Sequence, residues 1–191
     1  MNKNIFRIAF NKALKEHGLT VYFEWDNHFL FVRNGNSSKI VSVQLVGSTK
    51  INPLIHSSRY GMEIEAIGHF NFYIHKWTDK INYYIFAFYN ISKGVQFVII
   101  PENDLRARFQ LQNRIPLKRK KVELKFWLMP DQCLYDTTNI SVEEEWYYLS
   151  KGVNGRMTDG TYLDYVQYLN NWVGLVKNSF NYSESDQFLE K

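Results

Sequence analysis

The chain has 191 residues, of which 45% are apolar, and its formal net charge is +4. This length suits one domain or two small ones, and the apolar fraction excludes a wholly disordered chain. A single cysteine excludes an internal disulfide framework, and no run approaches the roughly 20 apolar residues of a transmembrane helix. The N-terminal residues lack the apolar stretch of a signal peptide, so we expect a cytoplasmic protein with no membrane partner.

The N-terminal segment predicts a helix followed by three strands. Apolar residues recur at helical spacing over 4–17, and Gly18 then ends the helix. The segments that follow are rich in β-branched and aromatic residues, and turn signals separate them at Asp26-Asn27 and Asn34-Gly35. The predicted strands span 20–25, 28–33 and 39–47.

Two nearly continuous apolar runs, over 82–90 and 95–100, dominate the middle of the chain. Strands that are buried on both faces have this composition, so both runs predict central strands of a sheet. Pro101 ends the second run, and a short helical turn is expected after it, over 105–109. Less regular strands, separated by a bulge at Gly68, are expected over 62–67 and 69–75.

The last third of the chain predicts one strand and two helices. The alternation of polar and apolar residues over 121–128 predicts the strand. Ser141 and Glu144 form a capping box, which predicts a helix that ends at Gly152. Aromatic and apolar residues at helical spacing predict the second helix over 161–177.

This order of elements predicts an α/β or α+β protein. A central mixed β-sheet would carry an N-terminal helix and C-terminal helices. We expect two units in the chain, because the strand-rich part ends with the strand at 121–128. They are a core over 1–128 and a helical extension over 129–191 that packs on this core.

The charges are unevenly distributed along the chain. Residues 106–125, called the basic band below, hold eight bases and one acid, whereas residues 126–191 hold four bases and ten acids. Such a band can attract the phosphates of DNA or RNA; the alternative is a solvated hairpin or linker paired with the acidic C-terminal region. The bases of the band are Arg106, Arg108, Arg114, Lys118, Arg119, Lys120, Lys121 and Lys125.

The order of elements over residues 5–109 resembles a known superfamily. A helix and a hairpin precede a strand that contains Val43-Gln44-Leu45-Val46. The later strands correspond to 84–88 and to the run 97–101, FVIIP. This arrangement resembles the restriction-endonuclease-like superfamily, which comprises the PD-(D/E)-x-K nucleases and the Holliday-junction resolvases. The resemblance implies a nuclease-like core and an association with nucleic acid.

The resemblance also implies a metal site. The family holds Mg²⁺ with a carboxylate and a second acceptor, and a Lys orients or activates the attacking water. Asp26 and Gln44 would be the metal ligands here, and Lys50 near the end of the strand would supply the ammonium. Because Val46 occupies the position of the family's Lys, we expect a degenerate member with lost or altered catalysis and no cofactor. An active Mg²⁺-dependent endonuclease is the alternative.

An aromatic stripe on the predicted last helix is a candidate surface for a protein partner or a second copy of the chain. The stripe can also pack on the helix that precedes it. The first functional hypothesis is a nucleic-acid-associated protein, and the second is a non-enzymatic interaction module or subunit that docks through its C-terminal helices. The candidate interface residues are Tyr162, Tyr165, Leu169 and Trp172.

Overall fold

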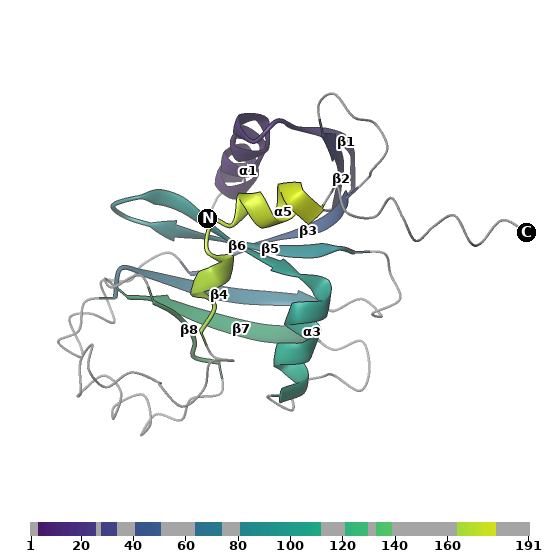
Figure 1. Cartoon of the computed structure of the whole chain (residues 1–191). Coiled ribbons are helices and arrows are strands. Elements are labelled where there is room, and N and C mark those ends of the chain that lie inside the picture. The colour runs from purple at the N-terminus through teal and green to yellow at the C-terminus, as the bar shows by residue number, and fades with distance from the viewer. Residues whose placement is uncertain are drawn as a thin grey trace, which may run out of the picture.

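Figure 1 shows the computed structural model of the chain. The description below covers residues 4–25, 28–33, 41–50, 64–73, 81–111, 121–129, 133–138 and 164–178. These residues form three layers, in which a five-stranded sheet lies between two helices on one face and a three-stranded sheet on the other (Figure 1). The helices of the first layer are α1 (Asn4–Glu16) and α5 (Trp172–Asn178).

The five-stranded sheet is the predicted central mixed sheet. Its strand order is β1-β2-β3-β5-β6, in which β3 and β5 pair in parallel and the other neighbours are antiparallel. This confirms the mixed α/β fold class with an N-terminal helix and C-terminal helices. The strands are β1 (Leu19–Trp25), β2 (His28–Arg33), β3 (Val41–Gly47), β5 (Tyr83–Asn90) and β6 (Gly94–Pro101).

The three-stranded sheet is antiparallel and has the order β4-β7-β8. A single strand replaces the two strands and the bulge predicted around Gly68, because β4 and β7 pair without a break in register. Gly68 is required here for a different reason, since a Cβ atom at this position would lie 2.5 Å from the Phe70 ring. The strands are β4 (Ala66–Tyr73), β7 (Lys121–Leu128) and the unpredicted β8 (Leu134–Asp136).

The two hydrophobic cores explain the apolar run in β5. Alternate residues of this strand point to opposite faces of the sheet. Phe86 and Phe88 pack between the two sheets, and Ile85 and Ala87 pack against the helical layer. The prediction of a strand buried on both faces is therefore confirmed.

The predicted helix over 161–177 is wrong, because the chain forms a strap followed by a shorter helix. Residues 164–170, called the strap below, contain the 3-10 helix η3 (Val166–Tyr168). Asp164 pairs with Tyr135 of β8, and Leu169 pairs with Val98 of β6. The strap therefore joins the edges of both sheets and then leads into α5. The predicted helix over 141–152 lies outside the described residues.

Candidate binding pocket beside the strap

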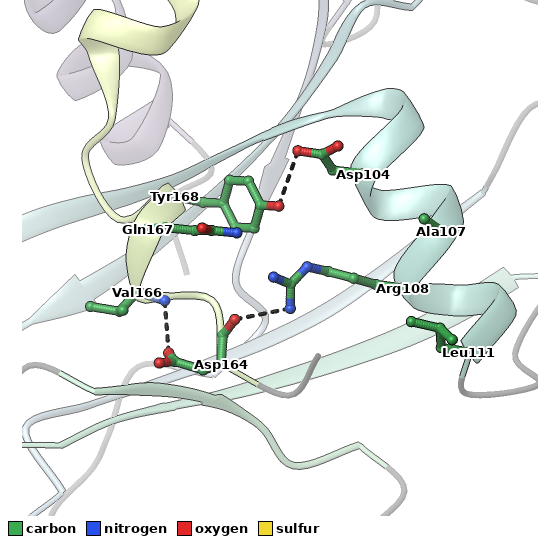
Figure 2. A pocket seen from close by; sticks show the side chains of 8 residues that line it. All are labelled: Asp104, Ala107, Arg108, Leu111, Asp164, Val166, Gln167 and Tyr168. Atoms are coloured by element: carbon green, nitrogen blue, oxygen red, sulfur yellow. Dashed lines mark hydrogen bonds between the residues drawn. The ribbon is translucent and has the colours of Figure 1, made fainter. Parts of the chain in front are cut away.

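A pocket of about 490 Å³ lies between the strap and α3 (Glu102–Leu111) (Figure 2). The α3 side contributes residues at positions i, i+3, i+4 and i+7, which share one face of a helix. Leu105 and Phe109, on the other face of α3, are buried in the core between the sheets and fix the helix there. The pocket residues are Asp104, Ala107, Arg108 and Leu111 of α3 and Asp164, Val166, Gln167 and Tyr168 of the strap.

Arg108 links α3 to the strap. Its Nη1 donates a hydrogen bond of 2.9 Å to the carbonyl oxygen of Asp164. The carbon of its guanidinium group lies 4.4 Å from the centre of the Tyr165 ring and 5.0 Å from that of Tyr168. Both distances are in the range of cation–π attraction, so the positive charge is held beside two aromatic rings of the strap.

Asp104 and Tyr168 form a second link across the pocket. The Tyr168 hydroxyl donates a hydrogen bond of 3.0 Å to Oδ2 of Asp104 (Figure 2). Burial raises the pKa of Tyr168, Arg108 acts to lower it, and the charge of Asp104 adds to the increase. The phenol therefore stays neutral at physiological pH and remains a hydrogen-bond donor. This contact orients the Asp104 carboxylate on the pocket wall.

Asp164 holds a second carboxylate on the strap side of the pocket. Its Oδ1 accepts a hydrogen bond of 2.9 Å from the Val166 N–H, which begins η3. The exposed apolar side chains of Leu111 and Val166, at 67% and 39% exposure, add non-polar surface. The pocket thus combines carboxylates from both walls, a guanidinium group and apolar surface, and ligand sites commonly combine apolar surface with a few polar groups.

The predicted nuclease residues lie on β3, just after it and outside the described residues. Asp26 lies outside the described residues. Gln44 is in the middle of β3, and its Oε1 is buried without a hydrogen-bond partner. Lys50 is exposed and follows the end of β3, where both its N–H and its carbonyl bond to the Ser48 hydroxyl. Val46, where the resemblance would require a Lys, is 8% exposed and packs in the core between the sheets.

The described residues offer no other metal site. Among them, no group of three or more His, Cys, Asp or Glu side chains is arranged to hold a metal ion. His69 and Glu123 form a hydrogen bond on the outer face of the three-stranded sheet, and Lys125 lies 3.4 Å from the same Glu123 oxygen. Burial acts to raise the pKa of Glu123, but the bond from His69 and the charge of Lys125 outweigh it and lower the pKa.

The described bases of the basic band have different environments. Nε of Arg106 donates a hydrogen bond of 3.1 Å to Glu102, one helical turn before it. Lys125 pairs with Glu123, and Lys121 is exposed at the first position of β7. Arg108 belongs to the pocket. The four remaining bases, which lie outside the described residues, are Arg114, Lys118, Arg119 and Lys120.

The predicted interface stripe packs inside the chain in the part that the structure describes. Tyr165 is 0% exposed, and Trp172 is 6% exposed and packs against the rings of Phe10 and Phe97. Leu169 packs against the core between the sheets. The stripe is internal because the strap crosses a sheet edge, which sends Tyr165 and Trp172 into different cores. Tyr162 lies outside the described residues.

Sequence reasoning did not predict this pocket and named only Arg108 of its residues, as a base of the basic band. The spacing of Asp104, Ala107, Arg108 and Leu111 is visible in the sequence, but the helix over this segment was expected to be a short turn. The strap side had no comparable sequence signal for a pocket, because its aromatic residues suit a helix equally well.

No family model, curated protein or solved structure matches the chain. Among the described residues, no helix is both long and apolar enough to cross a bilayer.

Proposed function

We propose that the protein binds nucleic acid through the basic band without cleaving it. The observation that carries this proposal is the density of positive charge, with eight bases and one acid in residues 106–125. Lys and Arg side chains that neutralise phosphates release condensed counterions, which provides a sequence-independent affinity. Such contacts position a strand on the protein but do not specify its sequence.

The fold supports the proposal by anchoring both ends of the band. Its first part lies on α3, which Leu105 and Phe109 hold in the core between the sheets. Its last part lies on β7, where Val122 and Leu124 are buried in the same core. The described residues on either side of 112–120 therefore belong to two elements of one core.

The position of Val46 supports the absence of cleavage. An apolar side chain packed between two sheets cannot supply the ammonium group that the resemblance requires. The nuclease-type scaffold stays a prediction, and the role proposed for it is binding. Fold alone does not determine activity, so the assignment depends on a binding experiment.

The experiment measures affinity against salt concentration by fluorescence anisotropy, with labelled duplex DNA, single-stranded DNA and RNA. Each neutralised phosphate of duplex DNA contributes about −0.9 to the slope of log K against log salt. Replacing Lys118, Arg119 and Lys120 together by Ala should flatten the slope by roughly 2 to 3 if each contacts one phosphate. Incubation of plasmid with the protein and Mg²⁺ should leave the plasmid intact.

A matched control removes the same charge elsewhere. Arg7, Lys12 and Lys15 are exposed on α1, and Ala is the best helix former, so their replacement by Ala preserves this helix. This control should leave the slope unchanged. If the variant of Lys118, Arg119 and Lys120 has the same salt slope as the unmodified protein, the basic band does not bind the phosphates.

A further inference from the structure

We infer that the pocket between α3 and the strap binds an unpaired guanine base. The inference rests on the proposed function, because the base would belong to a strand that the basic band holds. It adds a preference among bases to an interaction that phosphate contacts alone leave non-specific. The pocket and the band overlap in sequence, since Arg108 and Leu111 line the pocket and lie within residues 106–125.

The hydrogen-bond donors of guanine match the acceptors of the Asp104 carboxylate. The Watson–Crick edge of guanine presents two neighbouring donors, the ring N1–H and the exocyclic N2 amine. A carboxylate has two oxygens with about four acceptor positions, and Tyr168 uses one of these positions on Asp104. Asp104 can therefore accept from both guanine donors while Tyr168 keeps the carboxylate in place.

Arg108 is placed to contact the acceptors of the same base. It lies one helical turn after Asp104 on the same face of α3, a spacing that places the two Cβ atoms about 5–6 Å apart. Guanine carries the acceptors O6 and N7 beside its donor edge, and Arg is the side chain that most often recognises them. Asp104 and Arg108 thus place an acceptor and a cation one turn apart on the pocket face of α3.

The apolar residues of the pocket suit the face of a guanine ring, and the edge that Asp104 would bind must be free of a pairing partner. The apolar side chains of Ala107, Leu111 and Val166 line the same pocket and can contact the face of a planar base. The guanine edge that Asp104 would bind is occupied by cytosine in a duplex, so the pocket requires an unpaired base. Adenine has no N1–H donor and no O6 acceptor, and it matches this arrangement less well.

The test compares labelled dT12 strands in which one central thymine is replaced by dG, dI, dA or dC. Inosine differs from guanosine only by the missing N2 amine, so the dG-to-dI exchange probes the carboxylate contact without changing the protein. We expect the dG strand to bind about tenfold more tightly than the dA strand and severalfold more tightly than the dI strand. The salt slope should be the same for all four strands, because their phosphates are identical.

Asp104→Asn should abolish the preference for dG over dI and leave the salt slope unchanged. Asn103→Ala is the matched control, since Asn103 is exposed on the same turn of α3 and does not line the pocket. Equal affinities for dG, dI and dA in the unmodified protein would overturn the inference and leave the proposed function standing. If none of the strands binds at low salt, the inference is overturned; the proposed function is overturned only if duplex DNA and RNA also fail to bind. A dG preference that survives Asp104→Asn would remove Asp104 from the site.

Discussion

Asn170 joins the strap to the edge strand β6, and replacing it should destabilise the protein by a predictable amount. Its Oδ1 accepts a hydrogen bond of 2.9 Å from the Phe97 N–H, and its Nδ2 donates one of 2.7 Å to Gln96. Its own N–H donates to the Phe97 carbonyl at 2.6 Å. Asn170 also has a φ of 50°, a left-handed conformation that Asn tolerates better than most residues.

The magnitude follows from these contacts. Asn170→Ala leaves the N–H of the buried residue Phe97 without its acceptor, at a cost of about 1–3 kcal/mol. The exposed bond to Gln96 adds about 0.5 kcal/mol, and Ala at a positive φ adds about 1 kcal/mol. We therefore expect a loss of about 3.5 kcal/mol for Ala and about 2.5 kcal/mol for Gly, which lacks the conformational penalty. Asn170→Asp keeps the acceptor and should lose least.

Urea unfolding followed by tryptophan fluorescence measures these differences in the free energy of unfolding. The order of stability should be the unmodified protein, then Asp, Gly and Ala at position 170. An Ala variant within about 0.5 kcal/mol of the unmodified protein would refute the reasoning about the edge contacts. Equal losses for Ala and Gly would refute the contribution of backbone conformation.

Three further predictions concern the core and the outer face of the three-stranded sheet. Phe86→Ala should cost about 3–5 kcal/mol in urea unfolding, because Phe86 is fully buried between the sheets. Gly68→Ala should cost about 1–3 kcal/mol, since its Cβ would press on the buried Phe70 ring; an unchanged midpoint would contradict this contact. The lowered pKa of Glu123 means that its stabilising effect is present at neutral pH and is lost as the pH falls below the ordinary value of 4.5. Glu123→Gln should therefore reduce the loss of stability between neutral and acidic pH, as measured by thermal unfolding. The same fall in melting temperature with pH in the variant and in the unmodified protein would exclude the interaction with His69.

The strands of the central sheet could be predicted because their determinants are local. The run over 82–90 is apolar at nearly every position, and only a strand covered on both faces hides such a surface from water. Helix α1 could be predicted for the same kind of reason, since its buried residues recur at helical spacing. The α3 side of the pocket also has a local signal, because Asp104 and Arg108 are one turn apart.

The strap could not be predicted, because its conformation depends on partners far away in the sequence. Tyr165 and Trp172 suit one stripe of a helix, yet they belong to different cores. The segment instead pairs with Val98 of one sheet and Tyr135 of the other, which satisfies backbone groups at both edges.

By itself, the amino-acid sequence determined the mixed α/β composition, the doubly buried strand and the density of bases in residues 106–125. Each of these follows from residues close together in the chain, through periodicity, burial or charge. Only the tertiary structure decided that Val46 packs between the two sheets and that Arg108 lies beside Tyr165 and Tyr168. Such placements depend on which sheet edges pair, a choice made by the free energy of the whole core rather than by any one segment.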